Sequence, residues 1–257
     1  MSLNLSRTVF YYQAEHRACD TLIIAALDRL TGQYPILGFL KLYHILRKEG
    51  HVWNHKRVYR VYKAMKLNIR RKKKRRLPER VKMPLSQPDH MNHSWSMDFM
   101  SDCLQDGIRF RTLNIIDDFN REALTIDIDT SIASGRIIRC LERIIEDSGK
   151  PKQIRVDNGP EFTSFIFQQW CKDNDIHIHY IQPGKPTQNA FIERFNGSYR
   201  REILNAYFFN SIDEVREITQ SWLWHYNATR PHEALNNLTP FEFIEHKQNL
   251  NIFELST

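Results

Sequence analysis

The chain has 257 residues, and its net charge of +7 is unevenly distributed: residues 1–90 carry 20 Lys and Arg against 6 Asp and Glu, and residues 91–257 carry 17 against 24. No apolar run approaches the roughly 18 to 20 residues of a membrane span, and no secretory signal opens the sequence, so we expect a cytoplasmic protein without a membrane partner. The absence of a C-x-x-C pair excludes a zinc ribbon or a disulfide framework for the four cysteines, Cys19, Cys103, Cys140 and Cys171.

Residues 1–69 are predicted to form a small all-α domain of three helices. Apolar residues recur at helical spacing over about 20–30 and about 36–48. They are Leu22, Ile23, Ala26, Leu27 and Leu30 in the first helix, and Leu37, Leu40, Tyr43 and Leu46 in the second. Asn54 is the predicted N-cap of the third helix, which directs Val58, Val61, Tyr62 and Met65 inward.

The outward face of the third helix is basic. Helix, turn and basic amphipathic helix is the outline of a helix-turn-helix domain, whose last helix enters the major groove of double-stranded DNA. The predicted DNA-contacting residues are Lys56, Arg57, Arg60 and Lys63. The alternative is a small helical domain whose basic face is merely solvated.

Residues 70–93 are predicted to be a linker, because they combine uninterrupted cations at 70–76 with Pro78, Pro84 and Pro88. A solvated linker is the alternative to one that gains affinity by displacing counterions from DNA phosphates. We favour the phosphate-binding function, carried by Arg71, Lys72, Lys73 and Lys74.

Residues 94–257 alternate between strand and helix signals. Strands are predicted over 94–100, 108–116, 123–129, 154–156 and 176–181, and helices over 137–145, 162–174 and 187–204. The first three strands resemble an antiparallel meander, and the later order of helix and strand indicates a mixed sheet covered by helices. The predicted class is therefore α/β, with further helices at the C-terminus.

Three acidic residues stand in apolar surroundings on elements that can meet at one side of this sheet. Asp98 lies within the first strand, Asp157 ends the fourth, and Glu193 lies on the last predicted helix. Each alone is explained by a salt bridge or a cap, but three converging carboxylates need a cation. Two Mg²⁺ or Mn²⁺ ions would serve phosphoryl transfer. Asp102, Asp117, Asp118 and Glu161 are assigned to turns and caps.

The set Asp98, Asp157 and Glu193, with 35 residues between the last two, resembles the Asp-Asp-35-Glu core of retroviral integrases and insertion-sequence transposases, which have an RNase H-like fold. Five stretches resemble the second-frame (OrfB) product of IS-three-type insertion sequences. They are "WSMDFMSD", "LNIIDDFNREAL", "IRVDNGPEF", "YIQPGKPTQNAFIERFNGSYRREIL" and "HYNATRPHEALNNLTP".

The resemblance implies a transposase that cleaves and joins DNA at the terminal inverted repeats of an insertion sequence. It makes the three acids the catalytic metal ligands and Arg200 a contact to the phosphate backbone. Further expected DNA contacts are Asn158, Lys185, Thr187, Gln188, Asn189 and Asn196, and Gly159 would let the backbone approach the substrate closely. It also implies nucleoid association in a bacterium and an upstream-frame (OrfA) partner or fusion.

Two rival functions remain open at this stage. A catalytically retired copy would bind DNA without cutting it, although all three acids are intact. An RNase H-type nuclease shares the fold, although the 35-residue spacing and the basic N-terminal domain favour transposition. Because two DNA ends are cut and joined together, we expect a homo-oligomer on DNA.

Overall fold

The computed structural model describes residues 20–69, 87–182 and 186–255, and their side chains except those of 186, 187 and 249–255. The chain divides into two compact units, Met1–Lys73 and Lys74–Thr257, each with its own hydrophobic core. None of the described helices is long and apolar enough to cross a membrane. Some of the predicted DNA-contacting residues lie outside the described part of the chain: Arg71, Lys72, Lys73, Lys74 and Lys185.

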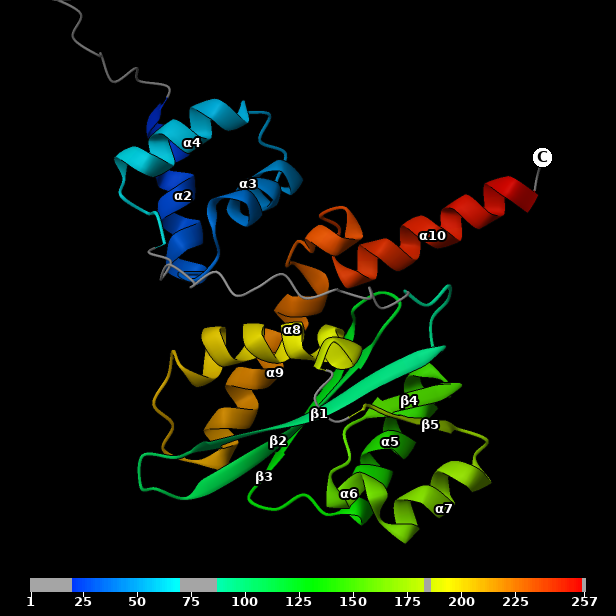
Figure 1. The fold of residues 1–257 in the computed structure, drawn as a ribbon. Coiled ribbons are helices and arrows are strands. Elements are labelled where there is room, and N and C mark those ends of the chain that lie inside the picture. Colours follow the sequence, from blue (N-terminus) through cyan, green and yellow to red (C-terminus); the bar gives the residue numbers. More distant parts are fainter. Residues whose placement is uncertain (1–19, 70–86, 183–185, 256–257) are drawn as a thin grey trace, which may run out of the picture. The chain divides into compact units, whose positions relative to one another are not determined.

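The described part of the N-terminal unit consists of three helices, α2 (Thr21–Gln33), α3 (Phe39–Lys48) and α4 (His55–Ala64) (Figure 1). Asn54 caps α4, because its side chain accepts a hydrogen bond from the Lys56 amide at 2.9 Å, as predicted. Gly50, with φ of +89°, makes the turn between α3 and α4. The core is made by one face of each helix: Ile23, Leu27, Leu30, Leu42, Ile45, Leu46, Val58, Val61 and Tyr62.

The prediction is wrong for two of the apolar residues that recur at helical spacing, because they do not lie in the core. Leu22 and Leu40 are each 66% exposed. The second helix begins at Phe39, three residues later than predicted, with Gly38 as its extended N-cap. The burial of Leu42 sets the rotation of that helix, so Leu40 turns outward.

The C-terminal unit is built on a five-stranded mixed sheet (Figure 1). Its strands are β1 (Ser94–Cys103), β2 (Arg109–Asp117), β3 (Ala123–Asp129), β4 (Gln153–Val156) and β5 (His177–Tyr180), in the order β3-β2-β1-β4-β5. The first three strands pair antiparallel, whereas β4 runs parallel to β1 and β5 parallel to β4. The predicted meander and the mixed α/β sheet are confirmed.

Helices cover both faces of the sheet (Figure 1). On one face α5 (Ser134–Ser148) and α7 (Phe165–Asp173) pack over Trp95 and Met97 of β1. On the other face α8 (Ala190–Tyr199) and α9 (Ile212–Ala228) pack through residues such as Phe195 and Trp222. Strand β1 is therefore central and alternates between two cores, so its even-numbered side chains face α8.

Two predicted helices are interrupted. The segment 162–174 forms α6 (Pro160–Thr163) and α7, because Ser164 adopts extended backbone and its hydroxyl caps α7 at the Phe167 amide. The segment 187–204 forms a 3-10 turn (Pro186–Asn189), α8 and a π-helical turn (Arg200–Leu204). The last helix, α10 (Pro240–Leu255), follows α9.

Candidate active site

Asp98 and Asp157 lie on neighbouring parallel strands at the same level. The register pairs Trp95 with Ile154 and Ser96 with Arg155, and each aspartate comes two residues after the second pair. Asp157 directly follows the last residue of β4, and its Oδ1 accepts a hydrogen bond from the Gly159 amide at 2.9 Å. The end of a short strand thus presents one carboxylate beside the carboxylate of the central strand.

Glu193 is brought to the same place by the docking of α8. Three residues further along this helix, Asn196 donates from Nδ2 to Asp98 Oδ2 at 2.8 Å. Residues three apart on a helix share a face, so Glu193 lies on the side of α8 that meets β1. The three predicted acids therefore come from three elements that converge at the middle of the sheet.

The electrostatics of Asp98 report this convergence. Burial, together with the negative charges of Asp157 and Glu193, raises the pKa of Asp98 to about 6. The Phe99 amide and the Asn196 side chain act against this rise by donating hydrogen bonds. Burial also raises the pKa of Glu193. These carboxylates therefore repel one another at neutral pH.

Within the described ranges, no three His, Cys, Asp or Glu side chains are close enough together to hold a metal ion as they stand. The charges of Asp157 and Glu193 thus act on Asp98, but the three carboxylates are not close enough to bind one ion together. Their oxygen donors are of the type that Mg²⁺ and Mn²⁺ prefer.

The other acids near the strands have structural partners. Asp117 accepts hydrogen bonds from the Asn92 and Phe119 amides, which is the predicted turn function. Asp118 is fully buried and binds Arg155 at 2.8 Å and the hydroxyls of two serines, so it forms a buried ion pair instead of a cap. Glu161 is ion-paired with Arg111.

Arg200 makes contacts that the sequence did not indicate. It donates from Nη1 to Asp102 Oδ2 at 2.5 Å and from Nη2 to the Ser101 carbonyl at 2.8 Å. Asp102 and Asp98 lie on the same face of β1. Arg200 and Asn196 therefore contact the same face of this strand, four residues apart. Asp102, assigned to a turn or cap, is thus the ion-pair partner of Arg200, and its cap-like bond to the Cys103 amide is secondary.

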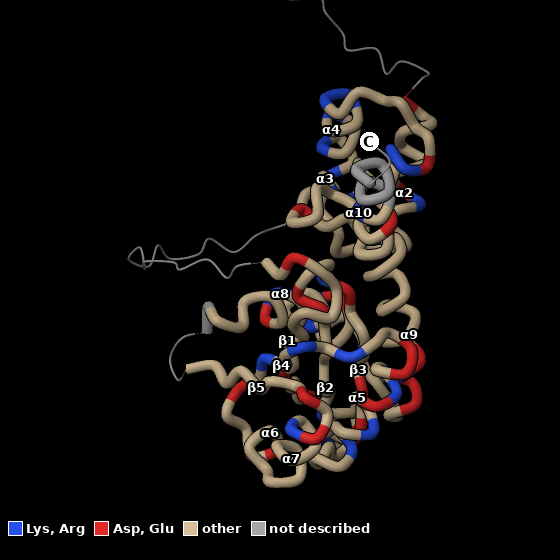
Figure 2. The backbone as a smooth tube through the Cα atoms, turned by 90° about the vertical axis from the view of Figure 1, so that its right-hand side faces the viewer, with Lys and Arg blue, Asp and Glu red and all other residues tan. Residues whose placement is uncertain are grey.

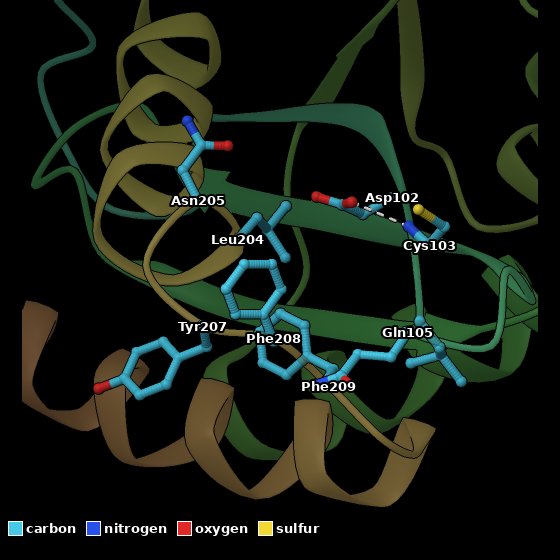
Figure 3. A pocket seen from close by; sticks show the side chains of 9 residues that line it. Asp102, Cys103, Gln105, Leu204, Asn205, Tyr207, Phe208 and Phe209 are labelled. Atoms are coloured by element: carbon cyan, nitrogen blue, oxygen red, sulfur yellow. Dashed lines mark hydrogen bonds between the residues drawn. The ribbon is translucent and has the colours of Figure 1, made fainter.

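A groove of about 870 Å³ lies beyond this ion pair (Figure 3). Asp102 and Cys103 form one wall, and Leu204, Tyr207, Phe208 and Phe209 from the segment after α8 form much of the other. None of the three acids of the candidate site lines it, so the groove is separate from the carboxylates.

The remaining predicted DNA contacts near the site are mostly engaged within the protein. Asn196 is buried and holds Asp98, and Asn189 is only 3% exposed. Asn158 donates to the Ile181 carbonyl, and Gln188 accepts from the Gln182 amide. The side chain of Thr187 lies outside the described part of the structure. The amide of Asn196 therefore contacts Asp98, and its DNA contact stays a prediction.

Lys and Arg residues gather on α4 (Figure 2), and their side chains differ in their contacts. Lys56 and Lys63 are exposed. Arg57 and Arg60 instead bind the carboxylate of Asp20, at 2.9 and 2.6 Å. Asp20 is 5% exposed, and sequence reasoning missed it because its partners lie more than 35 residues away. The two arginines thus join α4 to the start of α2.

Comparison with known proteins agrees with this architecture. Residues 88–186 and 174–240 each match the Integrase core domain, and residues 20–75 match the HTH-like domain. The insertion element IS407 uncharacterized 31.7 kDa protein of Burkholderia multivorans is 39% identical over 241 residues, covering 94% of this chain and 87% of that protein. The putative transposase InsK for insertion sequence element IS150 of Escherichia coli is 23% identical, covering 93% and 89%.

A solved structure shows the same fold at low sequence identity. The simian T-cell lymphotropic virus intasome, in complex with PP2A regulatory subunit B56 gamma, superposes on 75% of this chain and 67% of its own with a TM-score of 0.51 and 22% identity.

A mixed five-stranded sheet flanked by helices, with matches to the Integrase core domain over residues 88–186 and 174–240, defines an integrase-type catalytic core of the RNase H-like class. The chain belongs to the insertion-element transposase family, whose members are DDE-type polynucleotidyl transferases acting on DNA. A helix-turn-helix-like segment precedes the core, as predicted.

Proposed function

We propose that Asp98, Asp157 and Glu193 are the catalytic carboxylates of this transposase and hold a pair of Mg²⁺ or Mn²⁺ ions. The observation that carries the proposal is the meeting of three elements. The parallel register sets Asp98 beside Asp157, and the bond from Asn196 to Asp98 brings Glu193 to the same strand. An RNase H-type nuclease or a retired DNA-binding copy is not favoured, because the relatives are insertion-element proteins and every acid is retained.

The charge of the site fits divalent cations. Asp98 is half-buried and two further carboxylates, Asp157 and Glu193, repel it, so burial and this repulsion together raise the pKa of Asp98. A cation offsets both, because it neutralises the charges and satisfies oxygens removed from water. When bound, the cations act as Lewis acids on the phosphodiester and stabilise the developing negative charge.

The chain itself supplies positioning and no nucleophile. In cleavage a water oxygen forms a bond to phosphorus, and the 3′-oxygen at the element's end leaves. In joining, that 3′-hydroxyl attacks a target phosphodiester, whose own 3′-oxygen leaves. Asp98 and Asp157 are held by backbone amides of Phe99 and Gly159, so their carboxylates are preset for this chemistry.

DNA is proposed to follow α8 from Glu193 to Arg200. Arg200 is one-third exposed and points along the same face of β1 as the carboxylates, so it can contact a phosphate while still bonded to Asp102. The other proposed contacts here are Asn158, Lys185, Thr187, Gln188 and Asn189. In this proposal, residues 94–257 are the core, 70–93 are a phosphate-binding linker, and 1–69 form the DNA-binding domain.

Two exposed lysines of α4 are proposed to contribute most to DNA affinity in the N-terminal domain, because Arg57 and Arg60 are engaged by Asp20. We expect Lys56→Ala with Lys63→Ala to weaken binding of duplex DNA in fluorescence anisotropy. The slope of log affinity against log salt should fall by about 2, since each lost phosphate contact removes roughly 0.9. Arg29→Ala, on α2 and paired with Glu49, is the control for loss of a cation away from α4. An unchanged slope in the double variant would contradict the assignment.

Assembly on DNA is also part of the proposal. Two ends must be cut and joined together, so we propose a homo-oligomer on paired ends, with an upstream-frame product as partner or fusion. Cleavage and joining of DNA in a bacterial chromosome would take place in the nucleoid, so we also propose association with it.

Removal of divalent cations tests whether the three carboxylates act through Mg²⁺ or Mn²⁺. Purified protein is incubated with a labelled insertion-sequence end, and cleaved and joined strands are resolved on a denaturing gel. We expect products with Mg²⁺ or Mn²⁺, none after chelation, and recovery when either ion is restored. Products that persist in excess chelator would show that the carboxylates work without a cation.

A further inference from the structure

Asn114 is a buried polar residue that sequence reasoning did not select. It lies on β2 directly opposite Asp98 in the antiparallel register and is 0% exposed. Its Nδ2 donates to Asn196 Oδ1 at 2.7 Å, and Asn196 in turn donates from Nδ2 to Asp98 Oδ2 at 2.8 Å. Asn114, Asn196 and Asp98 thus form one hydrogen-bonded chain, the amide relay, across β2, α8 and β1.

The direction of the amide relay follows from chemistry. An ionised carboxylate only accepts hydrogen bonds, so the Asn196 amino group must face Asp98 and its carbonyl oxygen must face Asn114. Asn114 can bond to that oxygen only through its own amino group. A donor at position 114 therefore fixes the orientation of the Asn196 amide, which is otherwise free to flip.

The relay completes the restraint on Asp98. The Phe99 amide donates to Oδ1 at 2.9 Å, and Asn196 donates to Oδ2. Both oxygens of one carboxylate are therefore held by separate donors, and each keeps a further lone pair for a ligand. A carboxylate fixed in this way is preorganised for a cation.

The burial of Asn114 lowers the stability of the fold. Asn114 Oδ1 is buried and has no hydrogen-bond partner among the described residues, and an unsatisfied buried acceptor disfavours folding. An apolar residue of similar size would remove that cost. A polar group kept at a site where it does not stabilise the fold indicates a role in the chemistry.

We propose that Asn114 is a positioning residue that acts through Asn196 to preset the Asp98 carboxylate for a divalent cation. The proposal rests on the proposed role of Asp98 as a metal ligand. Asn114 itself contacts neither cation nor DNA in this arrangement.

The test replaces Asn114 by Leu, which has the same number and branching of side-chain heavy atoms and lacks the amide. Thr112→Val is the matched control, because Thr112 lies two residues away on the same face of β2, is 0% exposed, and has a hydroxyl without a partner in the described structure. Three properties are measured in the full chain: Mn²⁺ affinity by electron paramagnetic resonance, melting temperature without metal, and kcat and KM for strand cleavage with Mg²⁺.

We expect Asn114→Leu to weaken Mn²⁺ binding and lower kcat by about 10- to 100-fold, the usual effect of losing a residue that orients a metal ligand. Its KM for DNA should stay unchanged and its melting temperature should be equal or higher. Thr112→Val should match wild type in Mn²⁺ affinity and kcat. Wild-type Mn²⁺ affinity and kcat in Asn114→Leu would overturn the proposal.

Two further variants separate the possible failures. Should Asn114→Leu lower the melting temperature, Ile116→Val on the same strand shows what destabilisation alone does, and equal losses of Mn²⁺ affinity in both variants would overturn the proposal. Asp98→Asn tests the foundation. If it retains cleavage, the proposed catalytic site is wrong, whereas its inactivity beside a fully active Asn114→Leu refutes only the positioning role.

Discussion

Replacement of Glu193 by Gln is expected to abolish strand cleavage and joining while leaving the fold and DNA binding intact. Glu193 is exposed on α8 and makes no hydrogen bond or ion pair with another described residue, so the isosteric change removes only a charge. Loss of one carboxylate from a cation site costs several kcal/mol in the transition state, and about 4 kcal/mol corresponds to a roughly 10³-fold lower rate.

The expected separation of binding from catalysis follows from the division of the chain. The helix-turn-helix-like residues lie in the N-terminal unit, and Glu193 lies in the other. The measurement compares product formation on a labelled insertion-sequence end with affinity for the same DNA. Glu217→Gln, an exposed acid on α9, is the control for a lost charge and should be fully active. Activity of Glu193→Gln near that of Glu217→Gln would remove Glu193 from the catalytic set.

Gly159→Ala is the second change with a large expected effect. Close approach of substrate to this glycine stays a prediction, and the structure adds a second constraint on the position, the side chain of Asp157. A Cβ at position 159 would stand 2.9 Å from Asp157 Oδ1 and 3.3 Å from Glu161 Oε2. The first distance is shorter than real Cβ contacts, so the Asp157 carboxylate must move.

The backbone of Gly159 does not require glycine. Its φ of −61° and ψ of 149° are open to alanine, so we expect Gly159→Ala to fold normally. Displacement of a catalytic group by about 1 Å can lower the rate by roughly 10²-fold. Strand cleavage with Mg²⁺ and the melting temperature are measured together.

Gly135→Ala is the matched control for this substitution. Gly135 lies in α5, where a Cβ would meet only Arg139 Nη1, at 3.8 Å. Alanine is the better helix former by about 1 kcal/mol, so this variant should gain stability and keep full activity. Full activity of Gly159→Ala would mean that Asp157 can shift without loss, which contradicts its role as a fixed ligand.

Local patterns predicted the elements that carry the site. The strand predicted over 94–100 is present as part of β1, and its period of two puts Trp95 and Met97 on one face and Asp98 on the other. The helix predicted over 137–145 lies within α5, which ends at Gly149 with φ of +87°. Periodicity failed where the start of a helix was misplaced, as at Leu40, and where one serine broke a continuous apolar pattern, as at Ser164.

The sequence by itself determined the order of strands and helices along the chain and the basic character of α4, because these depend on local spacing and residue type. The choice of the three acids stays a prediction. Only the tertiary structure decided which partners the polar groups take. Asn196 reaches Asp98, Arg200 reaches Asp102, and Arg57 reaches Asp20. Each pair joins residues far apart in the chain, and such contacts depend on strand register and helix docking, which a single sequence does not encode locally.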